Sequence, residues 1–108
     1  MVYTLDELYD RIAPIAKKYR LKAVYVFGSY ARGEATESSD IDLLIDTAGT
    51  NIKSLLHLAA VYSDLEDALQ KEIDLITFSS IEQQAMMPSD NRFREAVLKE
   101  RVNIYAAA

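Results

Sequence analysis

The stretch of sequence that decides the fold is residues 28–43, which read GSYARGEATESSDIDL. Residues 23–27 before it are β-branched or aromatic and stop at Gly28, a pattern typical of a buried strand. Residues 41–45 resume a strand-like apolar run. The chain between these runs carries two glycines and no apolar period, which predicts a loop with room for one helical turn. Neighbouring strands would bring the glycine-serine pair that opens this stretch together with the two aspartates near its end.

Helical and strand-like patterns alternate on both sides of this stretch. Thr4 and Glu7 have the spacing of a capping box and start an amphipathic helix over residues 4–20. A long helix is expected from residues 49–51 to about residue 71, because an apolar stripe recurs there at helical spacing. The other expected elements are a strand over 73–78, a helix capped by Ser89 and a short edge strand over 102–105.

This order of elements predicts an α/β (α+β) domain in which helices flank a small mixed β-sheet. The strands over 23–27, 41–46 and 73–78 should be neighbours in that sheet. At 108 residues, half of them apolar, the chain has the length for one domain with one core. We therefore expect a single domain over residues 1–105, followed by an uninformative tail over 106–108.

Composition narrows the classes of function. The sequence has no cysteine, no apolar run of bilayer length and no leader-like N-terminus, so we expect a cytoplasmic protein with no membrane role. The formal net charge of −5 argues against direct nucleic-acid binding, since gripping a phosphate backbone needs a patch of lysine and arginine.

Three aspartates are candidates for a metal site. Asp40 and Asp42 stand two apart at the start of a strand, so their side chains leave the same face about 6.6 Å apart, at roughly 3.3 Å per residue. Asp74 lies in another predicted strand, where a carboxylate is otherwise disfavoured. Clustered carboxylates repel one another unless a cation neutralises them, and oxygen ligands favour Mg²⁺ or Mn²⁺ over Zn²⁺. Taken alone, an Asp-x-Asp at a strand start is more often a solvated turn.

Gly28 and Ser29 are candidates for binding phosphate. They follow a predicted strand directly, at a position where backbone N–H groups and a hydroxyl can meet a phosphate. An isolated Gly-Ser pair is more often an ordinary turn with a capping serine. The combination with an Asp-x-Asp that opens the next strand favours the phosphate-binding interpretation.

These motifs together resemble a known family. Residues 28–33 (GSYARG), followed by residues 39–43 (SDIDL), resemble the signature of the minimal nucleotidyltransferases of the DNA polymerase beta superfamily. The resemblance in element order extends over nearly the whole chain. Within the motifs, Arg32 and Ser39 would steady the loop or touch phosphate, or would make purely structural pairs with nearby acids, and these alternatives stay open.

The resemblance also implies roles for the other candidates. Gly28 and Ser29 would hold the triphosphate of ATP. Asp40 and Asp42 would bind two Mg²⁺ ions, and Asp74 would match the third carboxylate of the catalytic and metal site. Such an enzyme moves a nucleoside monophosphate from a nucleoside triphosphate to an acceptor hydroxyl.

Members of the resembled family are commonly antitoxins, which implies a partner. They pair with a small helical HEPN ribonuclease and silence it by transferring AMP to its tyrosine. Two alternatives stay open: transfer to a small hydroxyl compound, and a non-catalytic antitoxin that neutralises its partner by contact alone. Asp42→Asn separates the last alternative from the enzymes, because it removes transfer and leaves contact inhibition intact.

Overall fold

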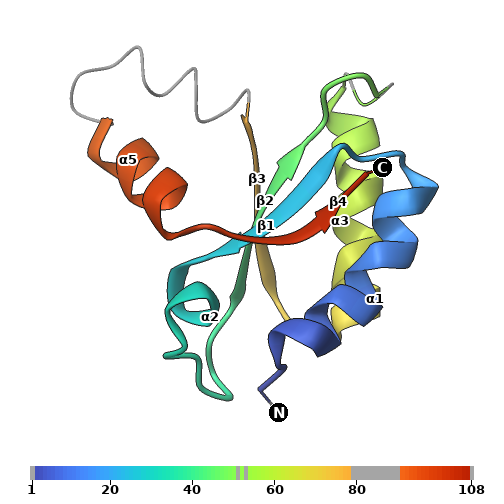
Figure 1. Ribbon diagram of the computed structural model, residues 1–108. Coiled ribbons are helices and arrows are strands. Elements are labelled where there is room, and N and C mark those ends of the chain that lie inside the picture. The colour runs from blue at the N-terminus through green and yellow to red at the C-terminus, as the bar shows by residue number, and fades with distance from the viewer. Residues whose placement is uncertain (1, 51, 53, 79–90, 108) are drawn as a thin grey trace.

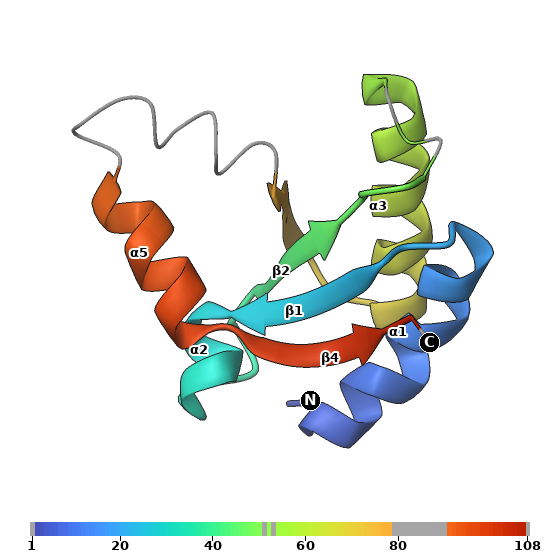
Figure 2. The same cartoon turned by 45° about the horizontal axis from the view of Figure 1, so that its top comes forward.

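The computed structural model describes residues 2–50, 52, 54–78 and 91–107. In this part of the chain, four strands form one mixed sheet with the order β3-β2-β1-β4 (Figures 1 and 2). β1 pairs antiparallel with β2 and with β4, whereas β2 pairs parallel with β3. The predicted small mixed sheet and its three neighbouring strands are therefore confirmed. The strands are β1 (Ala23–Phe27), β2 (Ile41–Asp46), β3 (Ile73–Thr77) and β4 (Val102–Ala106).

Helices cover both faces of this sheet. α1 (Leu5–Lys18) and α3 (Leu55–Leu69) lie on one face, and α5 (Asn91–Glu100) lies on the other (Figures 1 and 2). α2 (Gly28–Arg32) is a single short helix that follows β1 directly. The expected capping box starts α1, because the Thr4 hydroxyl accepts a bond from the Glu7 N–H and the Glu7 carboxylate accepts one from the Thr4 N–H.

The core has a large and a small part because side chains alternate across the strands. The large part lies between the sheet and helices α1 and α3, and it includes Val24 and Val26 of β1 with Leu43 of β2, all fully buried. On the opposite face, the small part consists of Phe27, Leu44 and Val97. This thinner layer leaves space near the end of β1, where the candidate site opens.

The predicted start of the long helix is wrong. α3 begins at Leu55, and its N-cap is Ser54, whose hydroxyl accepts a bond from the His57 N–H. The chain turns before that point: Gly49 has a φ of 76°, and the Thr50 hydroxyl donates to the Thr47 carbonyl at 2.6 Å. Gly49 and Thr50 therefore form a turn at the position where the helix was expected to begin.

The apolar stripe predicted for this helix is also only partly buried. Leu65 and Leu69 of this stripe are buried in the core, whereas Leu55 and Leu56 are 84% and 80% exposed. Helical spacing predicted the face of the helix correctly over its second half and wrongly over its first turn. An apolar pattern cannot by itself distinguish a core from an exposed contact surface.

The C-terminal strand is one residue longer than predicted. β4 runs to Ala106, which pairs with Ala23, and the Ala107 N–H donates to the Lys22 carbonyl at 2.9 Å. Ala106 and Ala107, two residues of the expected tail, therefore pair with the neighbouring strand segment at the edge of the sheet. The expected cap Ser89 lies outside the described residues, and the helix α5 is described from Asn91.

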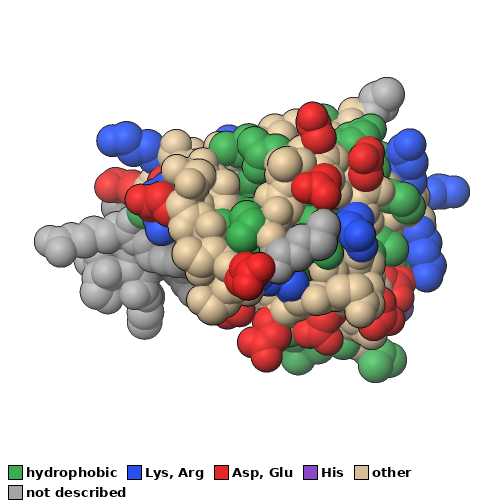
Figure 3. Space-filling view, turned by 90° about the horizontal axis from the view of Figure 1, so that it is seen from below, with side chains coloured by type: hydrophobic (Ala, Val, Ile, Leu, Met, Phe, Trp, Pro, Cys, Tyr) green, Lys and Arg blue, Asp and Glu red, His purple; other side chains and the backbone are tan. Residues whose placement is uncertain are grey.

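The surface carries mixed charge. Figure 3 shows acidic side chains spread over one face of the molecule, with basic side chains gathered mainly at its right margin. Within the described ranges, no helix is long and apolar enough to cross a lipid bilayer.

Candidate active site

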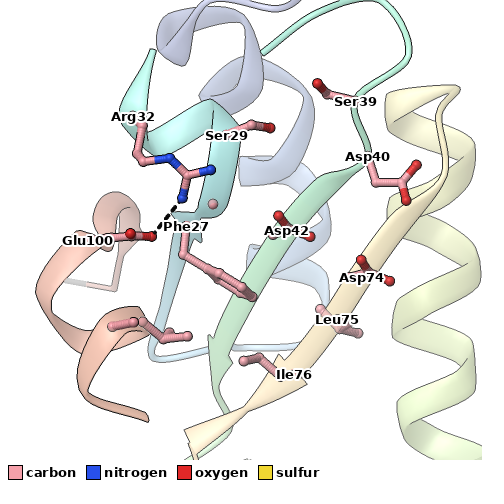
Figure 4. A pocket seen from close by; sticks show the side chains of 13 residues that line it. Phe27, Ser29, Arg32, Ser39, Asp40, Asp42, Asp74, Leu75, Ile76 and Glu100 are labelled. Carbon is pink, nitrogen blue, oxygen red and sulfur yellow. Dashed lines mark hydrogen bonds and ion pairs between the residues drawn. The ribbon is translucent and has the colours of Figure 1, made fainter. Parts of the chain in front are cut away.

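Strand pairing brings the two halves of the signature together. Phe27, the last residue of β1, pairs with Asp42 of β2, so that Gly28 lies beside this aspartate. β2 runs parallel to β3 in a register that pairs Asp42 with Asp74. The side chains of Asp40, Asp42 and Asp74 line the same pocket, which Ser29 enters from the opposite rim (Figure 4). Residues that are 46 apart in the sequence, 28 and 74, therefore meet at one end of the sheet.

Gly28 is required at this position for two independent reasons. Its φ is +69°, a left-handed conformation that side chains with a Cβ rarely adopt. A Cβ placed on Gly28 would also overlap the Asp42 Oδ2 atom and come within 3.1 Å of the Asp42 Cγ atom. The glycine lets the Asp42 carboxylate lie directly against the backbone.

The carboxylates of Asp42 and Asp74 form a coupled pair. The pKa of Asp42 is raised from 3.8 to about 6, first by burial and then by a hydrogen bond with Asp74 and the negative charges of Asp74 and Asp40. Arg32 acts weakly in the opposite direction. At neutral pH this group of acids carries charge that the fold disfavours and that a cation would stabilise.

The three aspartates supply the kind of donor set that a hard divalent cation takes, although they differ in placement. Asp42 is half-buried between the sheet and α2, whereas Asp40 and Asp74 are exposed. Within the described ranges, no three acidic or histidine side chains already converge into a metal cage. Carboxylate oxygens that line a pocket fit Mg²⁺ or Mn²⁺, and a bound cation would stabilise the negative charge of Asp42, which the metal-free fold disfavours. Such ions characteristically keep waters and take further ligands from a bound phosphate.

This raised pKa gives a pH prediction for the metal-free protein. Because the folded pKa of Asp42 lies above its unfolded value, its stabilising contribution is complete below about pH 4 and is lost as the pH rises through about 6. We expect the melting temperature of the wild type to fall relative to that of Asp42→Asn between pH 5 and 7.5 in a chelator. A constant difference over this range would contradict the coupled pair.

The pocket combines a polar end with an apolar end and has a volume of about 760 Å³. Its polar end holds the aspartates and serines, and Phe27 and Ile76 line its apolar end (Figure 4). Val97, which packs with Phe27, also lines the pocket. The volume lies within the range of about 300–1,000 Å³ that small-molecule sites occupy. A ligand with a charged tail and a flat apolar head, such as a nucleotide, matches this division.

The sequence alone did not indicate that Glu100 and the residues of the apolar end line the pocket. Val97 could have been found, because it recurs at helical spacing on the inner face of its helix, but nothing linked that face to the pocket. Glu100 carries no local signal. It reaches the pocket only because α5 packs beside α2, where its carboxylate contacts Arg32 at 3.1 Å.

Comparison with known proteins identifies the family. Residues 10–104 match the family model described as "Nucleotidyltransferase domain". The chain belongs to this family. It is a nucleotidyltransferase, and its relatives are named accordingly.

Two relatives and one solved structure illustrate the likeness. "Putative protein adenylyltransferase MJ0435" of Methanocaldococcus jannaschii is 43% identical over 77 residues, which cover 71% of this chain and 81% of the relative. "Protein adenylyltransferase MntA" of Thermococcus cleftensis is 38% identical over 82 residues, covering 72% and 81% respectively. A structure described as a tri-AMPylated Shewanella oneidensis HEPN toxin in complex with MNT antitoxin has a TM-score of 0.63 at 18% identity, covering 95% of this chain and 73% of that chain. At this identity the structural likeness concerns the fold.

Arg32 and Ser39, whose roles stayed open, have structural partners in this nucleotidyltransferase and also line the pocket. The Arg32 guanidinium contacts Glu34 at 2.6 Å as well as Glu100, and it is about half exposed. The Ser39 hydroxyl accepts a bond from the Thr36 N–H at 2.9 Å, which steadies the loop before β2. Both side chains face the pocket in Figure 4, so these contacts leave a phosphate contact open.

Ser29 differs from these two residues. The N-cap position of α2 is Phe27, so Ser29 is not the capping residue. Its hydroxyl lines the pocket and makes no hydrogen bond within the described part of the chain. A half-buried hydroxyl that faces a pocket without a protein partner is available to a ligand.

We expect Ser29→Ala to weaken ATP binding without loss of stability. A hydrogen bond to a charged phosphate oxygen contributes about 1.5 to 3 kcal/mol, so ATP affinity measured by calorimetry with Mg²⁺ should fall by that amount. The matched control is Ser54→Ala, which removes the N-cap of α3 and should lower stability by about 1 kcal/mol with unchanged ATP affinity. If Ser29→Ala behaves like this control, Ser29 is structural.

Proposed function

We propose that this nucleotidyltransferase transfers AMP from ATP to a tyrosine hydroxyl of a HEPN-type ribonuclease and acts as the antitoxin of that toxin. The observation that carries the proposal is the meeting of Gly28 and Ser29 with the coupled carboxylates of Asp42 and Asp74 in one pocket. Relatives with more than 35% identity are named protein adenylyltransferases, and a HEPN toxin occurs in the complex with the same fold.

The proposed orientation of ATP follows from the two ends of the pocket. The base lies against the apolar wall of Phe27, Ile76 and Val97, and the triphosphate lies beside Gly28 and Ser29. In this orientation the triphosphate lies close to the Asp42 carboxylate, which fills the space that a Cβ on Gly28 would take, so a cation would have to separate the two negative groups. Because the pocket is open at the aspartates, an acceptor hydroxyl can reach the α-phosphorus from that side.

Asp40, Asp42 and Asp74 would hold the divalent cations, and we propose two Mg²⁺ ions. When bound, these ions neutralise the carboxylates and phosphates and lower the pKa of the attacking hydroxyl. Without them, four phosphate charges would face a group of acids that already repel one another. ATP should therefore bind weakly in excess chelator.

The proposed reaction is an in-line displacement at the α-phosphorus. The acceptor oxygen forms a new bond to this phosphorus, the bond to the β-phosphate bridging oxygen breaks, and pyrophosphate leaves. The hydroxyl proton goes to a carboxylate, for which Asp74 is the best placed, since it is exposed at the pocket and shares a hydrogen bond with Asp42. All of these components are available in the cytoplasm, where we propose that the protein acts.

The proposal is tested by incubating the purified chain with ATP, Mg²⁺ and its candidate HEPN-type partner. Intact-mass measurement of the partner should show the addition of whole adenylyl groups, and peptide mapping should place them on a tyrosine. The ribonuclease activity of the partner should fall in parallel. An unchanged partner mass under conditions in which ATP binds would rule out this acceptor.

A further inference from the structure

An apolar groove lies between α3 and the edge strand β3, outside the nucleotide pocket. It has a volume of about 260 Å³, and we call it the α3–β3 groove. Leu55 is 84% exposed at one end of this groove, and Leu56 beside it is 80% exposed. Two adjacent leucines exposed in the first turn of a helix leave apolar side chains at the surface, of the kind found at interaction sites. The groove is lined by Leu55, Leu58, Ala59, Tyr62 and Leu75.

The α3–β3 groove and the nucleotide pocket lie on opposite faces of the sheet and meet at the edge strand β3. Leu75 lines both cavities, and its neighbour Asp74 is the carboxylate proposed to take the acceptor proton. β3 is the outermost strand of the sheet on this side. A protein seated in the groove can therefore reach the place where an acceptor hydroxyl must enter by extending around the edge of β3.

The border of the groove carries negative charge. Desolvation is the first cause that raises the pKa of the Tyr62 hydroxyl, and the negative charges of Glu66, Glu72 and Asp74 raise it further. Glu66, Asp67 and Glu72 line one hollow together with Lys71, so acidic side chains outnumber the basic one there. Apolar side chains on one side and carboxylates on the other favour a partner that presents apolar residues next to lysine or arginine.

We propose that the α3–β3 groove is the docking surface for the acceptor protein, and that the docking segment carries apolar side chains flanked by basic ones. This inference rests on the proposed transfer to a protein acceptor and names the surface that delivers it. Docking there would fix which hydroxyl of the acceptor protein reaches the pocket, because it holds the acceptor in one orientation.

The test compares two leucines in matched positions. Leu55 and Leu5 are each the first residue of a helix, after the N-caps Ser54 and Thr4, where an acidic side chain suits the helix dipole. Leu55→Glu changes the groove, and Leu5→Glu places the same charge on α1, where Leu5 is 41% exposed. Binding of the HEPN-type partner, its AMP transfer, ATP affinity and melting temperature are measured for both variants.

Leu55→Glu should weaken partner binding at least tenfold and raise the KM for the partner, with ATP affinity and melting temperature unchanged. Leu5→Glu should behave as the wild type. Glu66→Lys should also weaken binding; if it strengthened binding, the partner would be acidic and the stated chemistry wrong. Wild-type binding and transfer by Leu55→Glu would overturn the docking surface and leave the proposed function standing.

The remaining outcomes also separate the two proposals. If the wild type binds the partner through Leu55 without transferring AMP, the docking surface stands and the proposed function fails. If the wild type neither binds nor modifies the partner, both fail. If the chain alone forms dimers in size-exclusion chromatography that Leu55→Glu dissociates, the groove joins two copies of this chain, and docking of an acceptor protein is overturned.

Discussion

Asp42→Asn is expected to slow AMP transfer about a thousandfold while the domain stays folded. The substitution removes one charge from the proposed metal site and keeps nearly the same shape. If this loss removes about 4 kcal/mol of transition-state stabilisation, the rate falls by roughly three powers of ten. Single-turnover transfer to the partner measures the change.

The stability of the same variant gives a second, opposite expectation. The raised pKa of Asp42 means that its charged form is disfavoured in the metal-free fold. Without Mg²⁺ at pH 7.5, Asp42→Asn should therefore melt at the same temperature as the wild type or higher. The matched control is Asp46→Asn, at the far end of the same strand, where the side chain accepts a bond from the Ala48 N–H. This control should transfer AMP at the wild-type rate.

Retained transfer together with a lowered melting temperature in Asp42→Asn would identify Asp42 as a structural residue. The metal site and the roles given to Asp40 and Asp74 would then have to be withdrawn. Loss of transfer in both Asp42→Asn and the control would instead indicate a general effect of charge removal on β2.

Gly28→Ala is expected to lose most of the transfer activity and part of the stability. The new Cβ would overlap the Asp42 carboxylate, so this carboxylate must move away from the nucleotide pocket. The left-handed φ of +69° adds about 1–2 kcal/mol of strain. A displacement of about 1 Å in a positioned group can cost a hundredfold in rate, so transfer should fall by at least that factor.

Gly33→Ala provides a control for the backbone strain. Gly33 has a φ of +72° in the same loop, but a Cβ there meets no atom within 4 Å. Its substitution should lower stability by about 1–2 kcal/mol and leave transfer within a few-fold of the wild type. The difference in rate between the two variants isolates the contact with Asp42. Equal transfer rates would show that this contact has no bearing on the reaction.

The features predicted correctly from the sequence rest on local patterns. The strand before Gly28, the strand after Asp40 and the capping box of α1 each follow from side chains within a few residues of one another. The strand pattern around Asp74 predicted that this residue lies in the sheet, and the observed register pairs it with Asp42. These patterns are reliable because burial on one face leaves little freedom of register.

The features that the sequence did not predict depend on tertiary contacts. The close approach of Gly28 to Asp42 exists only once β1 and β2 are paired. Tyr30 falls in the segment that the sequence predicts as a loop, yet its side chain is buried in the large core. The exposure of Leu55 was equally hidden, since an apolar residue at helical spacing looks the same in a core and at a docking surface.

The most direct test of the account follows the phosphorus atoms of ATP. The wild type is incubated with Mg²⁺, the HEPN-type partner and ATP labelled at either the α- or the γ-phosphate. Nucleotidyl transfer predicts that the α-label enters the partner and that the γ-label is released in pyrophosphate, with neither occurring in Asp42→Asn. Entry of the γ-label into the partner, or transfer of the α-label undiminished in Asp42→Asn, would contradict the account.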